Sequence, residues 1–290
     1  MSTDTPIRWG IIGPGRIAQT FADGIAHSRS GKLVAIASRN PDKPGLGDNF
    51  PGARIVSGYE ALLADKDIDA VYIATPHTGH AEWAIKAIRA GKHVLVEKPI
   101  ALSAYDAEAI YYEAKKAGVF AGEAFMYRVH PQTAKLIALV KSGAIGELRI
   151  IRSSFGFNMG TVKPEHRLFA NETAGGGILD VGGYPVSMAR LIAGAADGNP
   201  FLDPDKVSGV AHLGQTGVDL DRRRQVLGAE VHATDVPTNP DRQPAAAPRL
   251  TSMTVQRRGF WLAKIASSAS GRGVPATGLT SGSTAAPASG

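Results

Sequence analysis

The sequence predicts an α/β fold, and three observations support this prediction. Short apolar segments that suit strands alternate with helix-forming stretches over residues 7–123, which is typical of a parallel sheet with helices on both faces. A glycine-rich turn follows the first of these segments. The alternation ends after residue 123, and a longer strand expected at 148–157 begins a second sheet. We therefore expect a doubly wound parallel sheet of the Rossmann type, followed by an α+β domain.

Length and composition exclude several classes of protein. A chain of 290 residues, 43% hydrophobic and 20% charged, is long enough for two globular domains. It contains no cysteine, which excludes disulfides and cysteine-rich zinc sites, and no cluster of residues has the spacing of metal ligands. No apolar run reaches the about 18 residues of a membrane span, and residues 1–6 have no signal character. We expect a cytoplasmic protein without a metal and without a membrane partner.

The net charge of +6 is concentrated at the C-terminal end of the chain. Residues 1–220 contain 23 Lys and Arg against 22 Asp and Glu, whereas residues 221–290 contain 9 against 4. The first 220 residues are therefore almost neutral and lack the excess of basic residues that binds a phosphate backbone. We expect no nucleic-acid partner.

The segment 13–18, Gly-Pro-Gly-Arg-Ile-Ala, matches the pattern G-x-G-x-x-A between a strand at 7–12 and a helix at about 16–27. Glycine at 13 allows a tight turn, glycine at 15 lets the backbone approach a pyrophosphate, and a small residue at 18 allows close packing. The N-terminus of the helix offers free N–H groups to phosphates. This context predicts a dinucleotide site that includes Gly13, Gly15, Arg16 and Ile17. The alternative is a turn that binds no phosphate.

A second strand, expected at 32–38, ends in Ser38-Arg39-Asn40. An NAD-preferring site usually places a carboxylate here, on the ribose hydroxyls. A hydroxyl and a guanidinium instead suit a 2′-phosphate, so we expect Ser38 and Arg39 to bind NADP, with NAD as the second choice. The alternative is that Arg39 is a solvated loop residue. The next segment, 41–52, has three prolines and three glycines and is not expected to form a helix.

The segment 94–100, Val-Leu-Val-Glu-Lys-Pro-Ile, is central to the expected site. Its apolar start predicts a buried strand, and Glu97 and Lys98 follow directly. In an open α/β sheet, ligands bind beyond the carboxyl ends of the strands, so these charges are expected to face a crevice. The alternative is a charged pair that caps a strand at the surface.

The remaining elements are expected from periodicity, caps and turns. A strand is expected at 70–74, a helix at 81–90 that ends at Gly91, a helix at 103–117 with a capping box of Ser103 and Asp106, and a strand at 119–123. Beyond these we expect helices at 132–141 and from 184 to about 193, and strands at 148–157, 206–213 and 216–219.

Asp180 and Tyr184 are four residues apart, which places them on one face of a helix. A tyrosine with a pKa of about 10 is a poor base at neutral pH, and a nearby lysine charge would lower that pKa by favouring the phenolate. The alternative is a carboxylate at a helix start beside a half-buried aromatic ring.

Several motifs together resemble the glucose–fructose oxidoreductase/inositol dehydrogenase (Gfo/Idh/MocA) family. They are the fingerprint at 13–18, Thr75-Pro76 with His80, Glu97-Lys98-Pro99, and Gly-Gly-Gly-x-Leu-Asp-x-Gly-x-Tyr at 175–184. The run Glu-Ala-Phe-Met-Tyr-Arg at 123–128 and the tyrosine at 184 are most similar to the dihydrodiol dehydrogenase and D-xylose dehydrogenase branch. The resemblance covers about residues 7–219.

The resemblance implies hydride transfer between a nicotinamide and the carbinol carbon of a sugar or vicinal diol. It implies that Lys98 lies by the nicotinamide and the substrate hydroxyl, that Asp180 orients the substrate, and that Tyr184 exchanges the proton. Further cofactor contacts are implied for Thr75, Pro76, His80 and Glu97. Arg128 and His130 are expected to line the substrate pocket or to cap the following helix, and His77 and His80 to contact the cofactor or only the loop.

The C-terminal part departs from the family pattern. The family's second domain is a broad open sheet that also forms a subunit interface, so the resemblance implies a homodimer. After Leu220 the strand pattern stops, and Ala, Gly, Ser, Thr and Pro make up 39 of the last 70 residues, leaving few long apolar side chains to offset the ordering entropy. We expect an NADP-binding domain at 1–123, a partial α+β domain with an open mixed or antiparallel sheet at 124–220, and an atypical, largely disordered tail at 221–290.

Two explanations of the tail and three functions follow. Either the tail results from a shift of reading frame near residue 220, or the chain is a short member of the family with a disordered tail. The first function is an NADP-dependent oxidoreductase acting on a sugar or diol. The second is a non-catalytic dinucleotide-binding protein with an incomplete second domain. The third uses transient oxidation during glycoside cleavage, without net change of the cofactor.

Overall fold

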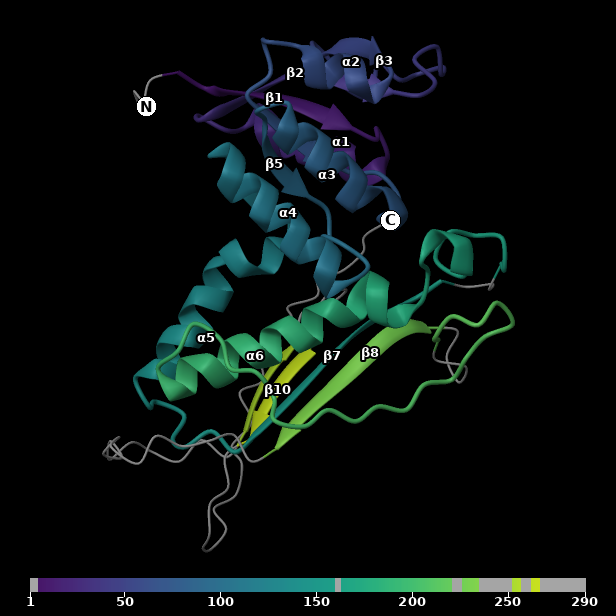
Figure 1. Cartoon of the computed structure of the whole chain (residues 1–290). Helices are drawn as coiled ribbons and strands as arrows, with labels where there is room; N and C mark the ends of the chain where they lie inside the picture. Colours follow the sequence, from purple (N-terminus) through teal and green to yellow (C-terminus); the bar gives the residue numbers. More distant parts are fainter. Residues whose placement is uncertain (1–4, 160–162, 221–225, 235–251, 257–261, 267–290) are drawn as a thin grey trace, which may run out of the picture.

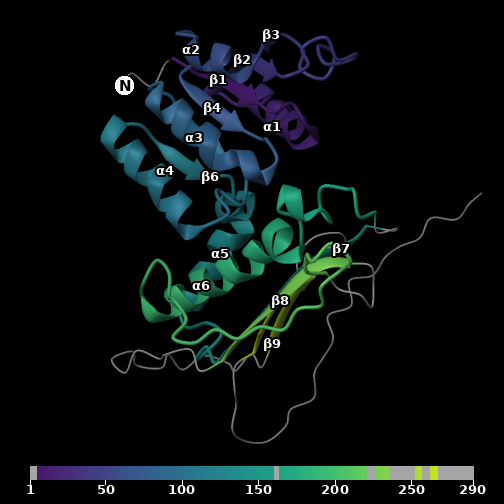
Figure 2. The same ribbon diagram turned by 45° about the vertical axis from the view of Figure 1, so that its right-hand side comes forward.

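The computed structural model describes residues 5–159, 163–220, 226–234, 252–256 and 262–266. Its framework is two separate sheets, a six-stranded sheet in the N-terminal part and a four-stranded sheet in the C-terminal part (Figure 1). The carboxyl end of the last strand of the first sheet leads into the second domain (Figure 2).

The first sheet is parallel throughout, with the strand order β3-β2-β1-β4-β5-β6. Its strands are β1 (Ile7–Ile12), β2 (Gly31–Ser38), β3 (Arg54–Ser57), β4 (Ala70–Ile73), β5 (His93–Val96) and β6 (Ala121–Glu123). The order reverses between β1 and β4, the point at which ligands bind in doubly wound sheets. This confirms the predicted Rossmann-type fold.

Helices cover both faces of this sheet because alternate residues of its strands point to opposite faces. They are α1 (Arg16–Ala26), α2 (Tyr59–Ala64), the 3₁₀ turn η1 (His77–Gly79), α3 (His80–Arg89) and α4 (Ala104–Ala117). Ile11 packs in the core beneath α1, with Ile36 and Phe50. The next residue, Ile12, packs in the core on the other face with residues of α2, α3 and α4.

The predicted helices and strands of this domain are present, with boundaries that agree or differ by at most two residues. The Ser103 hydroxyl accepts a hydrogen bond from the Asp106 N–H at 3.1 Å, as the capping box predicts. Segment 41–52 forms turns rather than a helix. The short elements β3 and α2 were not predicted, because four and six residues carry little periodic signal.

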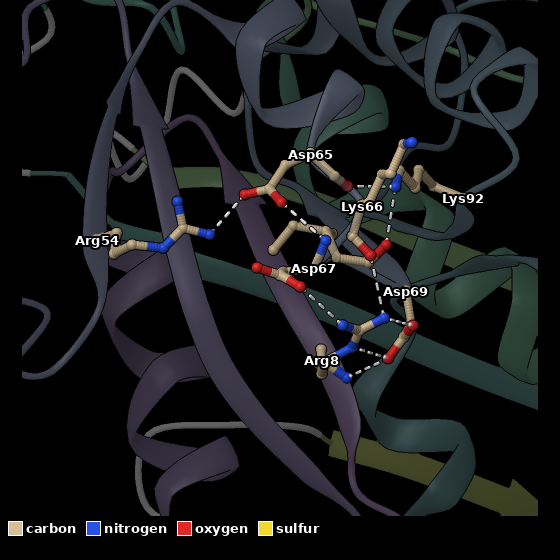
Figure 3. Close-up of polar contacts among 8 residues, drawn as sticks. Arg8, Arg54, Asp65, Lys66, Asp67, Asp69 and Lys92 are labelled. Atoms are coloured by element: carbon tan, nitrogen blue, oxygen red, sulfur yellow. Dashed lines mark hydrogen bonds and ion pairs between the residues drawn. The ribbon is translucent and has the colours of Figure 1, made fainter.

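A charged network ties together the amino ends of the strands, opposite the expected site (Figure 3). The Arg8 guanidinium donates to both carboxylate oxygens of Asp69, at 2.7 and 3.0 Å, and to Asp67 at 3.2 Å. The buried Lys92 ammonium donates to the carbonyl oxygens of Asp65 and Ile68, at 2.6 and 2.8 Å. These contacts join the start of β1 to the segments that precede β4 and β5.

The second domain packs helices against an antiparallel sheet of order β8-β7-β10-β9. Its elements are η2 (Met126–Val129), α5 (Pro131–Lys141), β7 (Ile150–Asn158), η3 (Asn171–Thr173), a π-helical turn η4 (Ile178–Gly182), α6 (Gly183–Asp197), β8 (Val226–Thr234), β9 (Ser252–Gln256) and β10 (Leu262–Ala266). Ile151 of β7, Leu136 of α5 and Ile192 of α6 share one core, so α5 and α6 lie on the same side of the sheet (Figures 1 and 2).

The C-terminal part differs from the sequence prediction in two respects. Segments 206–213 and 216–219 form no strands and meet in a single bridge between Leu213 and Asp219. Three strands lie within 221–290, and β8 pairs with β7 over nine residues, so strand structure continues beyond Leu220. The other residues of the expected tail lie outside the described residues. The domain boundaries therefore stay a prediction.

Within the described part of the chain, every helix is too short or too polar to cross a lipid bilayer.

Candidate active site

The predicted glycine-rich turn has the geometry of a phosphate-binding turn. Gly13 has φ of +84°, and a Cβ there would lie 2.8 Å from the carbonyl oxygen of Ala74 at the end of β4. Gly15, by contrast, faces open space, and no side chain caps the N–H groups at the start of α1. Free N–H groups beside a position without a side chain fit a pyrophosphate.

The exposed Arg16 and Ile17 lie in the first turn of the same helix. At the neighbouring strand end, the Thr75 hydroxyl is buried and has no hydrogen-bond partner among the described residues. An unpaired buried hydroxyl is costly unless a ligand or water satisfies it. Hydrogen-bond donors that a dinucleotide could use therefore lie on both sides of the crossover between β1 and β4. Pro76, which is exposed, follows Thr75 directly in the chain.

The end of β2 separates the two residues that were expected to bind a 2′-phosphate. The Ser38 hydroxyl is buried; it donates to the Asn40 carbonyl at 2.9 Å and accepts from the Asn40 N–H at 3.0 Å. Arg39 is exposed and makes no ion pair within the described residues. Arg39 is thus the residue free to meet a phosphate, while Ser38 shapes the turn.

Lys98 crosses from the first domain to the second. Its ammonium donates to the backbone carbonyl of Asp180 at 2.6 Å and to the Asp180 carboxylate at 3.2 Å. The same ammonium lies 5.5 Å from the centroid of the Tyr184 ring. The Lys98 and Asp180 side chains are 17% and 9% exposed. The structure therefore brings together the three residues for which the sequence implied catalytic roles.

Tyr184 lies in an aromatic enclosure. The ring centroids of Phe125 and Phe155 are 5.1 and 5.2 Å from that of Tyr184, and both rings stand nearly perpendicular to it. Burial, reinforced by the negative charges of Glu97 and Asp180, raises the pKa of the Tyr184 phenol well above its usual range. This differs from the expectation that a lysine charge would lower this pKa. Burial dominates because the enclosing rings remove water from the phenol.

Glu97 is held by neighbours within its own domain. Its carboxylate accepts hydrogen bonds from the Tyr72 hydroxyl and, at 3.2 Å, from the Lys98 N–H. The Tyr72 ring stacks on Phe21 of α1 at 3.9 Å between centroids. Glu97 thus fixes the chain at the end of β5 from which the Lys98 side chain leaves. The contact with a cofactor that the resemblance implies for Glu97 stays a prediction.

His80 joins two loops at the carboxyl edge of the sheet. Its ring nitrogens lie 2.7 Å from the Pro99 carbonyl and 2.9 Å from the Thr75 carbonyl, and the side chain is buried. Burial lowers the pKa of His80. His77, also buried, lies 3.0 Å from the carbonyl of Ala174 in the second domain. The sequence left open whether these histidines contact the cofactor or only the loop, and the structure shows the loop contacts.

Arg128 lies in η2, and His130 lies directly before α5. The Arg128 guanidinium stacks 4.4 Å from the centroid of the Phe201 ring and is exposed. The His130 ring accepts a hydrogen bond from the Gln132 N–H at 3.1 Å, which caps α5. The capping alternative therefore holds for His130, and a substrate contact of Arg128 stays a prediction.

Two residues that support the site, Glu123 and Asp219, were not predicted from the sequence. The Glu123 carboxylate, at the end of β6, accepts a hydrogen bond from the Ile100 N–H at 2.9 Å, so it supports the loop after Lys98. The rule that charges at carboxyl strand ends face the crevice could have found it. Asp219 supports the turn that carries Asp180, and no local sequence signal reveals this long-range contact. Among the described residues, no group of His, Asp or Glu has the arrangement of a metal site.

Two family models match the chain in succession. The model of the oxidoreductase family with an NAD-binding Rossmann fold matches residues 7–125, and that of the GFO/IDH/MocA C-terminal domain matches residues 133–234. The chain belongs to the Gfo/Idh/MocA family. The second match extends through β8, so this strand belongs to the family's sheet.

Curated relatives from the expected branch are similar to the chain. A trans-1,2-dihydrobenzene-1,2-diol dehydrogenase of Mus musculus is 33% identical over 73% of this chain and 62% of that protein. A D-xylose 1-dehydrogenase (NADP(+)) of Haloferax volcanii is 37% identical over 65% of this chain and 58% of that protein.

Among solved structures, a 3-ketoreductase from Actinomadura kijaniata in complex with NADP and TDP-benzene superposes with a TM-score of 0.59. It is 36% identical and covers 66% of this chain and 59% of the ketoreductase chain. The chain thus spans about three fifths of the length of the relatives that it matches.

Proposed function

We propose that the chain is an NADP-dependent oxidoreductase that transfers a hydride between nicotinamide and a carbinol carbon of a sugar or vicinal diol. The convergence of Lys98, Asp180 and Tyr184 from two domains is the observation that carries the proposal. The relatives support the substrate class, since the two curated ones are named for a dihydrodiol and a xylose, and the solved structure is that of a 3-ketoreductase with NADP and TDP-benzene.

The donors described above would hold the dinucleotide. The turn at Gly13 and Gly15 and the start of α1 would hold the pyrophosphate, the Thr75 hydroxyl would gain a partner, and Arg39 would bind the 2′-phosphate. When bound, the nicotinamide supplies or accepts the hydride. All further chemistry belongs to the side chains of this protein.

Tyr184 is the proton donor and acceptor of the proposed reaction. Its raised pKa keeps the phenol protonated at neutral pH, so it donates a proton to the oxygen of a carbonyl that is being reduced. Lys98 places a positive charge close by, which stabilises negative charge on that oxygen in the transition state. Asp180 holds the ammonium of Lys98 in place and orients the substrate hydroxyls.

A direct test follows the absorbance of reduced nicotinamide with a panel of aldoses, vicinal diols and keto sugars. We expect turnover with NADP for at least one of them. Lys98→Met and Tyr184→Phe should each reduce kcat by about 100-fold or more while NADP still binds, because each removes a group that acts in the transition state. Unchanged rates in both variants would contradict these roles.

Arg29→Met provides a matched control for loss of a positive charge, since Arg29 is exposed in the turn between α1 and β2 and is not one of the proposed site residues. We expect it to retain the rate of the unmodified protein. If the rates of Arg29→Met and Lys98→Met fell equally, the loss would reflect general charge rather than the position of Lys98.

A second candidate is a dinucleotide-binding protein without catalysis. It is favoured by the length of the chain, which spans about three fifths of its relatives, so about two fifths of their length has no aligned counterpart here. The same panel separates the two functions. Stoichiometric binding of NADP, with no hydride transfer to or from any compound, would support the second candidate.

A further inference from the structure

The backbone of Asp180 decides where the Lys98 ammonium lies. The shorter of their two contacts, at 2.6 Å, is made to the carbonyl oxygen of Asp180 and not to its carboxylate. That carbonyl belongs to the π-helical turn η4, which no side chain within the turn caps. Any residue that fixes the start of η4 therefore also fixes the partner of Lys98.

Asp219 fixes the start of η4 from a segment about forty residues further along the chain. Its carboxylate accepts a hydrogen bond from the Ile178 N–H at 2.8 Å, and its carbonyl oxygen accepts one from the Gly177 N–H at 2.9 Å. Two successive N–H groups at the start of the turn are thus bound by one residue. A negative charge at this position also interacts favourably with the positive end of α6, which follows η4.

Gly176 allows this close approach. Its φ is +107°, a backbone angle that residues other than glycine rarely adopt, and a Cβ there would overlap with the Asp219 carboxylate. Asp219 is itself fixed, since it pairs with Leu213 across a bridge and follows the buried Val218. Both partners of the contact between Asp219 and the start of η4 are therefore held in place.

We propose that Asp219 is a positioning residue for the reaction, which acts by holding η4 so that the Asp180 carbonyl keeps the Lys98 ammonium beside Tyr184. The proposal rests on the function proposed above, because it concerns the placement of a catalytic lysine. The bonds of Asp219 to this region go to the backbone N–H groups of Gly177 and Ile178. Its effect passes through the backbone of residues 177–180.

The test uses two substitutions at this position in the full chain. Asp219→Ala removes the acceptor, whereas Asp219→Asn keeps an oxygen that can accept the Ile178 N–H. We expect Asp219→Ala to reduce kcat on the order of 10- to 100-fold, as misplacements of about 1 Å do, with NADP affinity unchanged. Asp219→Asn should restore most of the rate. Gly176→Ala should resemble Asp219→Ala, and the two changes together should cost little more than either one.

A second readout does not depend on turnover. Lys98 is 17% exposed and Lys86 is 42% exposed, so labelling of lysines by an amine-reactive reagent, followed by mass spectrometry, reports on Lys98 with Lys86 as the internal reference. We expect labelling of Lys98 to rise several-fold in Asp219→Ala, well below the unfolding temperature, and to stay near the original level in Asp219→Asn. Asp205→Ala is the matched control, since Asp205 is exposed on the same connecting segment.

The outcomes separate the two proposals. A lower unfolding temperature of Asp219→Ala, with unchanged kcat for the folded enzyme and unchanged labelling of Lys98, would show that Asp219 serves stability alone and would overturn the inference. Absence of turnover in the unmodified chain, with increased labelling of Lys98 in Asp219→Ala, would refute the proposed function and leave the positioning role supported.

Discussion

At the scale of single residues, the role proposed for Tyr184 implies that its protonation state sets the direction in which the chain works best at neutral pH. The enclosing rings of Phe125 and Phe155 exclude water, and the raised pKa makes the phenol a donor rather than an acceptor. A protonated phenol favours reduction of a carbonyl, whereas oxidation of a carbinol needs the phenolate.

This leads to a prediction for the pH dependence of the reaction. The kcat for carbinol oxidation should still rise with pH at about pH 10, the usual pKa of tyrosine, because the folded-state pKa lies above that value. The kcat for carbonyl reduction should be level through neutral pH. Rates measured from pH 6 to 10.5 in both directions check this. An oxidation rate that is level above about pH 8, and that Tyr184→Phe does not affect, would contradict it.

Arg39 carries the prediction on cofactor preference. Its guanidinium is exposed and has no competing ion pair within the described residues, so it can meet a 2′-phosphate. Arg39→Asp should weaken NADP binding by about 100-fold and improve binding of NAD, because a carboxylate repels the phosphate and accepts ribose hydroxyls. Binding titrations followed by nicotinamide fluorescence measure both. Equal affinities for NADP before and after the substitution would show that Arg39 is a solvated loop residue.

At the scale of elements, the two edges of the parallel sheet have different tasks. The carboxyl edge carries Thr75, Glu97, Lys98 and Glu123, whereas the amino edge carries the network of Arg8, Asp69 and Lys92 (Figure 3). The network lies away from the expected site, and its contribution is to the stability of the sheet.

Asp69→Asn tests that contribution. Hydrogen bonds from Arg8 lower the pKa of the Asp69 carboxylate, so its stabilising effect is present above the unfolded-state pKa of about 3.9 and is lost as the pH falls through the lower folded-state pKa. We expect the variant to unfold at a lower urea concentration at pH 7 and the difference to shrink below about pH 4. Asp67→Asn is the control, with a smaller effect, since Asp67 accepts one longer bond and is more exposed. Equal effects at pH 7 and pH 3 would contradict the assignment.

The elements also show which parts of the site the sequence could predict. The turn at Gly13 and the charges after β5 follow local rules about glycine and strand ends. The contact of Lys98 with Asp180 joins residues 82 positions apart, and the burial of Tyr184 depends on rings from β7 and the segment before η2. Neither periodicity nor spacing reports such contacts. The prediction that the pKa of Tyr184 is lowered was therefore wrong.

At the scale of the whole molecule, the composition of the C-terminal segment misled the sequence reading. An average over 70 residues rich in small side chains hides the run that begins Val226-Leu227 and forms β8. Pairing with β7 supplies the order that the composition alone does not suggest. The match of the family model through residue 234 contradicts a shift of reading frame near residue 220, because residues up to 234 still match the family in the present frame.

The second sheet also bears on assembly. Helices α5 and α6 lie against one face, and no described helix lies against the other (Figures 1 and 2). The resemblance implies a homodimer, and sedimentation equilibrium over a range of concentrations measures whether the chain associates. The residues proposed to bind NADP all belong to the first domain of one chain, so we expect NADP binding to be the same at all these concentrations.

In the proposed reaction, Lys98 and Tyr184 act on the same oxygen of the substrate. A crystal structure of the chain with NADP and a bound sugar or diol, one that the absorbance assay identifies as substrate, tests this most directly. We predict that the Lys98 ammonium and the Tyr184 hydroxyl both lie within hydrogen-bond distance, about 3 Å, of one substrate oxygen. If the reacting oxygen of the bound substrate lies near only one of the two side chains, or if the two side chains lie in separate cavities, Lys98 and Tyr184 do not act together.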